Sequence, residues 1–275
     1  MKPAFTVSQT SIRLRGKAVP GAEDRQRKIA GFDQAAFSKS SVLCIGAGGL
    51  ISHIAPTLVR KGIDRITLLD DDVVEATNLN RQRFYTKDIG KNKALALAEN
   101  LERECIAPTE IRGVSLRLEE AIAREIDLGC DVAVCGVDNN PARVAASRHF
   151  RFLGIPVIFA GVSRDGDCGY VFVQEKHGPC IGCLYPDMAD DDRYPCPGTP
   201  AIADILQSVG SLAVYGVDTL LMNRLRKWNY RRVSLSDAAG DGAAMVESRA
   251  GCRMFASASD LAAAGSDAHF RKGER

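Results

Sequence analysis

The sequence predicts an α/β protein with a Rossmann-like, doubly wound and mostly parallel sheet, a β-rich C-terminal part and a cysteine-bearing crossover loop. Two observations predict this fold. Short strand-like runs alternate with segments of helical periodicity through the middle of the chain. In addition, a glycine-rich turn at residues 46–49 follows the first run directly and opens a helix. Sheets of this kind bind ligands at the carboxyl ends of their parallel strands.

The predicted elements follow one another in the order that a doubly wound sheet requires. Strands are expected at short runs rich in apolar residues, at residues 41–45, 65–69, 110–116, 131–137 and 155–162. Helices are expected where apolar residues recur at helical spacing, at residues 50–61, 91–105, 118–126 and 141–153. Residues 169–174 and 229–236 predict two further strands. Between them lie a loop rich in Pro, Cys and Asp and the longest helix, at residues 201–228.

Composition divides the chain and excludes several classes of protein. We expect an N-terminal extension at residues 1–24, a main domain at 25–237, and an Ala-, Gly-, Ser- and Asp-rich, weakly ordered tail at 238–275. The net charge of +2 argues against nucleic acid as a partner. The sequence has neither an apolar run of about 18–20 residues nor the apolar core of a signal peptide. We therefore expect no membrane contact and a cytoplasmic location.

The glycine-rich turn predicts a nucleotide site. Gly46, Gly48 and Gly49 would let the backbone approach a phosphate, and the helix that follows offers free N–H groups. Asp70 ends the next strand, where an acidic residue accepts hydrogen bonds from a ribose. An NAD-dependent dehydrogenase has this pair too, but here bulky Ile51 replaces the third glycine.

Polar and basic residues after the acidic strand favour a triphosphate over a dinucleotide. They are Asn78, Arg81, Gln82, Arg83 and Lys93. Arginine can hold phosphate oxygens with two hydrogen bonds, and lysine acts on them as a point charge. Asp138, at the end of another predicted strand, could hold a Mg²⁺ bound to the same phosphates.

Five segments in this order, VLCIGAGGL, ITLLDDDVV, NLNRQRF, GKNKA and GVDNN, resemble the ThiF/MoeB family, the bacterial relatives of ubiquitin-activating enzymes. The resemblance covers about residues 25–252. It implies ATP-dependent adenylation of the C-terminal glycine carboxylate of a small ubiquitin-like or sulfur-carrier protein that ends in Gly-Gly. It also implies a homodimer, in which Arg25 reaches into the ATP site of the partner subunit.

The resemblance assigns a role to each matching position. Gly46, Gly48 and Gly49 would line the nucleotide, Asp70 would hold the ribose, and Asp72 would lie near the phosphates and metal. The residues implied to bind and polarise the triphosphate are Asn78, Arg81, Gln82 and Lys93. Asp138 would hold Mg²⁺. The same chemistry on a peptide or on a carboxyl of a modified tRNA base is an alternative, as is a non-catalytic scaffold that binds a ubiquitin-like partner.

The cysteines predict a possible zinc site and a nucleophile. Cys180 and Cys183 form a Cys-x-x-Cys pair, typical of half a structural Zn²⁺ site. In the family a second pair completes the site; here Cys252 is present and Phe255 stands in place of the fourth cysteine. Two alternatives stay open: water, His177 or a partner chain completes the site, or the site is lost. Cys196, in the loop before the long helix, matches the position at which some family members carry the activated acyl group.

Overall fold

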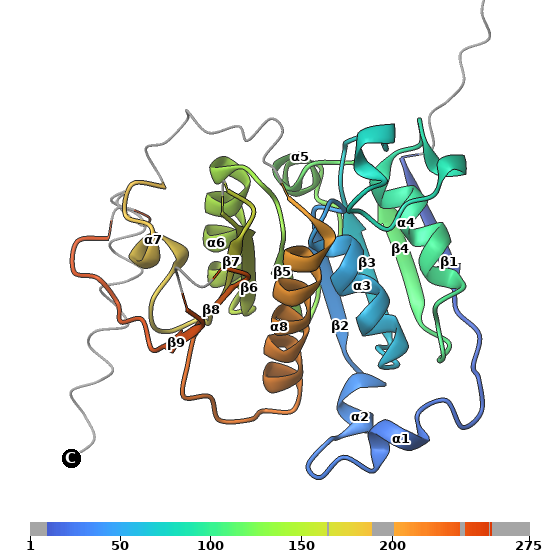
Figure 1. Ribbon diagram of the computed structural model, residues 1–275, viewed down its shortest axis with the longest axis horizontal. Coiled ribbons are helices and arrows are strands. Elements are labelled where there is room, and N and C mark those ends of the chain that lie inside the picture. The colour runs from blue at the N-terminus through green and yellow to red at the C-terminus, as the bar shows by residue number, and fades with distance from the viewer. Residues whose placement is uncertain (1–9, 164, 189–200, 237–239, 253, 255–275) are drawn as a thin grey trace, which may run out of the picture.

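The computed structural model describes residues 10–163, 165–188, 201–236, 240–252 and 254. Within these residues one sheet has the strand order β1-β4-β3-β2-β5-β6-β7-β8-β9 (Figure 1). The central five strands are parallel: β4 (Glu110–Val114), β3 (Arg65–Leu69), β2 (Ser41–Ile45), β5 (Val132–Cys135) and β6 (Val157–Val162). The flanking strands pair antiparallel: β1 (Ser11–Arg15), β7 (Cys168–Gln174), β8 (Tyr230–Ser234) and β9 (Gly242–Ala244). The predicted Rossmann-like fold is confirmed, with a mixed sheet.

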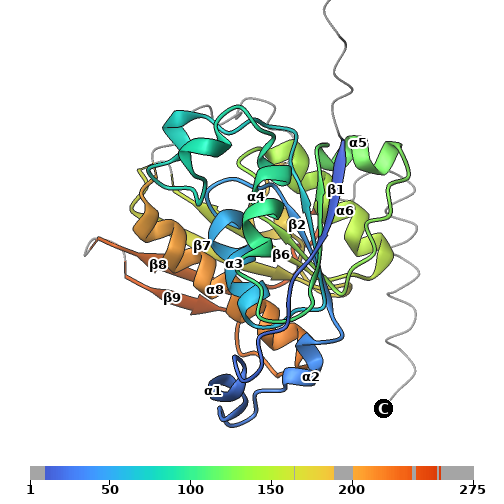
Figure 2. The ribbon, with the colours of Figure 1, turned by 90° about the vertical axis from the view of Figure 1, so that its right-hand side faces the viewer.

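Helices cover both faces of the sheet (Figure 2). One face carries α3 (Ile51–Arg60), α4 (Lys93–Glu102) and α8 (Ala203–Leu221). The other carries α5 (Leu118–Ala123), α6 (Asn140–Leu153) and α7 (Ile181–Leu184). Short helical turns complete the set: α1 (Asp24–Arg27), α2 (Gln34–Phe37), η1 (Ala76–Asn78) and η2 (Thr86–Asp88).

The central strand β2 shows why the apolar runs become strands. All five of its residues are buried. Successive side chains of a strand point to opposite faces. Val42 and Cys44 accordingly enter the core under α3, α4 and α8, whereas Leu43 and Ile45 enter the core under α5 and α6. A strand buried on both faces needs a continuous apolar sequence, and SVLCI supplies it.

Local signals set the ends of the helices that border the site. The side chains of Asn92 and Asn139 accept hydrogen bonds from backbone N–H groups in the first turns of α4 and α6. Gly154 ends α6 in the left-handed conformation, at φ 74°. The long helix α8 is shorter than predicted, because the chain turns at Asn223, which has a positive φ of 48°, before β8 begins.

Both ends of the chain add strands that the sequence did not reveal. β1 comes from the predicted N-terminal extension and pairs with β4 at one edge of the sheet. β9 comes from the predicted tail and pairs with β8, and the Asn229 side chain exchanges hydrogen bonds with the backbone of Val246. Residues 240–252 are therefore part of the fold, contrary to the expectation of a weakly ordered tail. No helix in the described ranges is long and apolar enough to cross a membrane.

Candidate active site

The glycine turn lies where the strand order of the sheet reverses. β2 pairs with β3 on one side and β5 on the other. In sheets of this order, ligands bind in the crevice outside the carboxyl ends of such strands. Gly46 has a positive φ of 90°, and its N–H donates to the Leu69 carbonyl at 2.7 Å. A side chain at Gly48 would meet nothing within 4 Å. The turn therefore presents bare backbone to open space, which fits a bound phosphate.

Asp70 holds the glycine turn in place. One carboxylate oxygen accepts a hydrogen bond from the Ala47 N–H at 2.6 Å, and the other accepts one from the Asp72 N–H at 2.8 Å. Burial raises the pKa of Asp70 to about 6, against the opposing effect of the Lys93 ammonium. The carboxylate is thus ionised at neutral pH and keeps lone pairs for a further donor such as a ribose hydroxyl.

Lys93 lies beside the acidic segment that follows β3. Its Nζ is 2.9 Å from the Asp72 carboxylate, which is 62% exposed. Asn92, a residue that sequence reasoning missed, ties the two segments together because its Nδ2 donates to the carbonyls of Asp70 and Asp72. Only the Asp72 side of this ion pair is open to water, because the Lys93 side chain is 12% exposed. A phosphate arriving from the solvent could therefore replace Asp72 as the partner of Lys93.

The segment after η1 carries the other predicted triphosphate ligands. Asn78 is buried, and its Oδ1 accepts a hydrogen bond from the Glu75 N–H, so it shapes the turn. The Arg81 guanidinium donates to the Thr77 carbonyl at 2.7 Å. Gln82 Oε1 is buried without a hydrogen-bond partner among the described residues. Such an atom is expected where a ligand completes the site.

His53 anchors this segment to α3, a role with no signal in the sequence. Its Nε2 is 3.0 Å from the Arg81 carbonyl, and its Nδ1 accepts from Arg83 Nε at 3.2 Å. Burial lowers the pKa of His53, which keeps the ring neutral and allows one nitrogen to donate while the other accepts.

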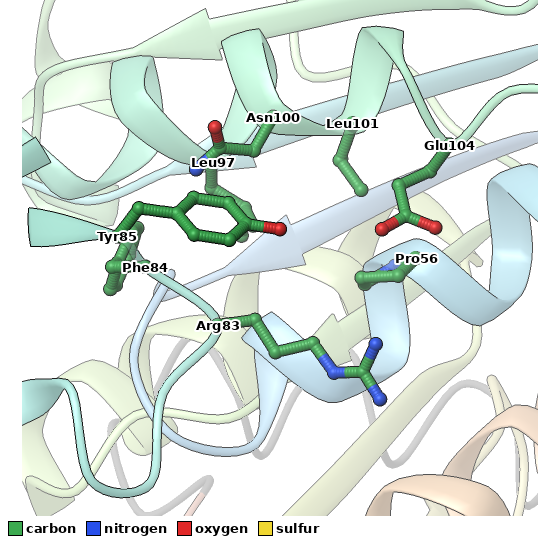
Figure 3. A pocket seen from close by; sticks show the side chains of 8 residues that line it. All are labelled: Pro56, Arg83, Phe84, Tyr85, Leu97, Asn100, Leu101 and Glu104. Atoms are coloured by element: carbon green, nitrogen blue, oxygen red, sulfur yellow. The ribbon is translucent and has the colours of Figure 1, made fainter. Parts of the chain in front are cut away.

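Arg83 belongs to a separate space between α3 and α4. It lines a cavity of about 220 Å³ with Pro56, Tyr85 and Leu97. Figure 3 shows Arg83 and Tyr85 extending into this cavity from one loop. Neither Asp70 nor Lys93 lines it. The basic cluster expected from the sequence is therefore divided, with Arg83 outside the crevice.

Asp138 follows β5 at the same edge of the sheet and is exposed. Its neighbour Val137 packs close to the glycine turn, since a side-chain carbon at Gly46 would lie 3.3 Å from Val137 Cγ1. Asp138 also borders a larger cavity of about 560 Å³ on its other side. It thus stands between the crevice and this second space.

The predicted site residue Arg25 is not brought to the glycine turn. Arg25 lies in α1, which packs against α2 and the carboxyl end of α3, where Gln26 donates to the Lys61 carbonyl. The glycine turn is at the opposite end of α3, as Figure 1 shows. Cys196 lies outside the described residues.

Comparison with known proteins shows the family of the chain. The ThiF family model matches residues 23–243. The chain belongs to the ThiF family. The SAMP-activating enzyme E1 of Haloferax volcanii is 29% identical over 192 residues, which are 69% of this chain and 70% of that protein. The sulfur carrier protein adenylyltransferase of Thermus thermophilus is 31% identical over 186 residues, which are 65% of this chain and 68% of that protein.

Other relatives match this ThiF-family chain over part of their length. The adenylyltransferase and sulfurtransferase MOCS3 of Xenopus laevis is 36% identical over 158 residues, which are 56% of this chain and 34% of that protein. Among solved structures, E. coli MccB has a TM-score of 0.69 at 17% identity, covering 86% of this chain and 73% of that chain. A second structure, of MccB with ATP, has a TM-score of 0.65 at 19% identity, covering 80% and 68%. At these identities the structural likeness shows the fold.

Three cysteines of this ThiF-family chain meet on the α6 side of the sheet. Cys180 Sγ is 3.7 Å from Cys183 Sγ and 3.4 Å from Cys252 Sγ. The Arg249 N–H donates to Cys183 Sγ at 3.4 Å. The neighbouring Cys180 thiol and the Arg249 amide lower the pKa of Cys183 from its usual value. The predicted trio is therefore confirmed as a cluster, whereas Phe255 lies outside the described residues.

Proposed function

We propose that this protein uses ATP to adenylate the C-terminal glycine carboxylate of a small ubiquitin-like or sulfur-carrier protein. One observation carries the proposal: Asp70 joins the glycine turn to the acidic segment, and Lys93 stands beside that segment at the crevice. The activities for which the relatives in Haloferax and Thermus are named support the reaction type. The alternatives of a peptide or tRNA carboxyl become outcomes of the test.

The residues fit what this reaction needs. Glycine backbone and the start of α3 would hold phosphate, and Asp70 would accept from the ribose. Lys93, Arg81 and Gln82 would bind the triphosphate and offset the repulsion between it and an incoming carboxylate. Positioning and charge stabilisation supply most of the catalysis in such transfers. No general base is required, since a carboxylate is already ionised at neutral pH.

A Mg²⁺ ion is part of the proposal. Asp138 would hold it, with Asp72 nearby, because exposed carboxylate oxygens are ligands that Mg²⁺ prefers. When bound, the ion neutralises charge on the phosphates and on the leaving pyrophosphate. The protein's part is to place Asp138 at the end of β5, next to the crevice.

A structural Zn²⁺ on Cys180, Cys183 and Cys252 is also proposed. A tetrahedral site with Zn–S distances of about 2.3 Å separates its sulfur atoms by about 3.8 Å. The observed separations of 3.7 and 3.4 Å agree with three ligands of such a site. A cytoplasmic location, expected from the sequence, is part of the proposal.

A homodimer follows from the position of Arg25 if this residue serves the ATP site. α1 lies at the end of α3 remote from the glycine turn, so Arg25 would act in the crevice of a partner subunit. Transfer of the acyl group to Cys196 remains a prediction from the sequence.

ATP–pyrophosphate exchange with Mg²⁺ tests the proposed reaction. The full chain is assayed with a panel of small proteins ending in Gly-Gly. We expect exchange that depends on one of them and falls at least about a hundredfold in Lys93→Ala and Asp138→Ala. Lys93→Ala loses a positive charge at the phosphates, and Asp138→Ala loses the carboxylate proposed to hold Mg²⁺. Lys91→Ala is the matched control, since Lys91 pairs with Glu99 on the outside of α4.

The outcomes separate the alternatives. Undiminished exchange in Lys93→Ala and Asp138→Ala would contradict the assigned site. If no protein of the panel supports exchange while ATP still binds, a peptide or tRNA carboxyl is favoured as the substrate. Absence of both exchange and ATP binding would favour a non-catalytic scaffold.

A further inference from the structure

The outer edge of β1 offers unpaired backbone groups. Strand β1 pairs with β4 on one side, and within the described residues no strand pairs with its other side (Figure 2). The Thr10 carbonyl accepts a hydrogen bond from the Ser115 N–H at 2.9 Å, so the even-numbered residues of this segment face β4. Because inward and outward groups alternate in an antiparallel ladder, the N–H and C=O groups of Ser11, Arg13 and Arg15 face outward.

The same edge carries a cluster of four arginines on one face of the sheet. Arg13 pairs with Arg112 of β4. Arg15 pairs with Glu110 of β4, which in turn pairs with Arg65 of β3. Paired residues, and residues two apart on one strand, point to the same face, so the four arginines share it. Three of them are exposed and Arg112 is half-buried. We call these four residues the basic face.

The charges of the basic face are not neutralised by the described part of the chain. Arg13 and Arg112 form a pair without mutual backbone hydrogen bonds, the kind in which opposite Cα atoms are only about 4.5 Å apart. Like charges directly opposite each other destabilise a sheet. No acidic side chain of the described residues forms an ion pair with any of the four arginines, and Arg112 Nη1 donates to the Asp127 carbonyl. Negative charges from a ligand would relieve this repulsion.

The opposite face of β1 is apolar. Ile12 and Leu14 point to the side that carries α4 and pack, partly buried, against the core there. A strand added outside β1 would therefore meet cations on one face and apolar side chains on the other. Its residues opposite Arg13 and Arg15 would be two positions apart and would point to the basic face. The pattern that fits is an acidic residue at every second position, with apolar residues between.

We propose that the outer edge of β1 binds an extended segment of a partner protein in which acidic residues alternate with apolar ones. The segment joins the sheet as a further strand. Backbone hydrogen bonds to Ser11, Arg13 and Arg15 supply affinity, and carboxylates against the basic face supply selectivity. A second copy of β1 does not fit, because it would place arginines opposite arginines. A nucleic acid lacks the alternating N–H and C=O groups that pair with a strand edge. The inference does not depend on the proposed adenylation.

Fluorescence anisotropy with the full chain and a short labelled peptide, in which Glu alternates with Val, tests the proposal. We expect saturable binding that weakens as the salt concentration rises. Arg13→Glu should weaken binding at least about tenfold. The double variant Arg13→Glu, Arg15→Glu should instead bind the same peptide with Lys in place of Glu, because both partners are then reversed in charge. Arg103→Glu is the matched control, since Arg103 is exposed at the end of α4 on the other face of the sheet.

Hydrogen exchange measured by NMR separates strand pairing from a loose electrostatic contact. Peptide binding should slow exchange at the outward amides of Ser11, Arg13 and Arg15. Unchanged exchange at these amides, or equal affinity for a shuffled peptide of the same composition, would overturn the added strand. Tighter binding of a single-stranded RNA oligonucleotide through the same arginines would overturn the protein partner in favour of nucleic acid. Absence of any binding would overturn the proposal and leave the arginines as a protection against edge-to-edge aggregation.

Discussion

Asp70 shows how burial changes the pKa of a single residue of the candidate site. Its carboxylate is enclosed under the glycine turn and receives two backbone hydrogen bonds. Burial disfavours the charged form and raises the pKa to about 6, although Lys93 opposes that effect. The residue that the sequence predicts for a ribose therefore has a pKa about one unit below neutral pH. If its carboxylate accepts from the ribose, nucleotide binding is coupled to proton release.

Nucleotide affinity should consequently depend on pH. In the unfolded chain an aspartate has a pKa of about 3.9. The contribution of Asp70 to the free energy of unfolding is therefore fully present below about pH 4 and is lost as pH rises through about 6. Ribose hydroxyls prefer the ionised carboxylate, so ATP binding has the opposite sign. We expect ATP affinity to rise up to about tenfold between pH 5 and 7.

Calorimetric titration of ATP at several pH values checks this expectation. Asp70→Asn should lose the extra pH dependence, whereas the titration of the nucleotide's own phosphates remains in every variant. Asp71→Asn is the matched control, because the Asp71 carboxylate pairs with Arg117 outside the glycine turn. Equal pH profiles for the unmodified protein and Asp70→Asn would contradict the assignment of Asp70.

At the scale of elements, the antiparallel pair β6 and β7 builds the cavity. Gly161 pairs with Tyr170 in the ladder. Because glycine has no side chain, the Tyr170 ring can lie across β6, and a carbon at Gly161 would be 2.5 Å from Tyr170 Cε1. A strand glycine whose neighbour fills its space in this way marks a close approach.

Gly161→Ala should therefore force the Tyr170 ring out of its position. We expect the free energy of unfolding to fall by about 1–3 kcal/mol, the usual cost of overpacking. Denaturant unfolding measures the change. Tyr170→Ala removes the clash, so Gly161→Ala should cost much less in a Tyr170→Ala background. Equal costs in the two backgrounds would show that the ring and the glycine do not interact.

At the scale of the whole molecule, the position of α1 bears on the proposed role of Arg25 in an ATP site. The Gln26 side chain holds α1 to Gln34 and to the Lys61 carbonyl, at the end of the sheet remote from the glycine turn. A residue on α1 that contacts ATP must then belong to a second subunit. Symmetric dimers share residues between sites in this manner.

Complementation between two inactive variants tests this arrangement. Arg25→Ala and Lys93→Ala should each abolish exchange alone. When the two chains are co-expressed, half of the random dimers are mixed, and one of their two sites has both residues intact. We expect about a quarter of the unmodified activity to return. No recovery in dimers shown to be mixed by mass would place Arg25 outside the shared site.

Local patterns in the sequence were enough for the central strands, their covering helices and the glycine turn with Asp70. These features depend on continuous apolar runs in the strands, on helical periodicity and on short spacings, which act through neighbouring residues. The sequence also predicted the cluster of Cys180, Cys183 and Cys252 through a family resemblance. It did not reveal β1 and β9, because edge strands with few buried residues carry a weak apolar pattern.

The tertiary structure alone decided which distant residues share a space. It divided the basic cluster by turning Arg83 towards His53, and it joined Cys168, Arg143 and Arg232 in one cavity. No short spacing in the sequence predicts that these residues lie together. They follow from the antiparallel register of β7 and β8 and from the packing of α6 over β6, both of which pair segments far apart in the chain. The sequence by itself determined the glycine turn and the strand ends around it, and long-range pairing determined which side chains line the cavity beside Asp138.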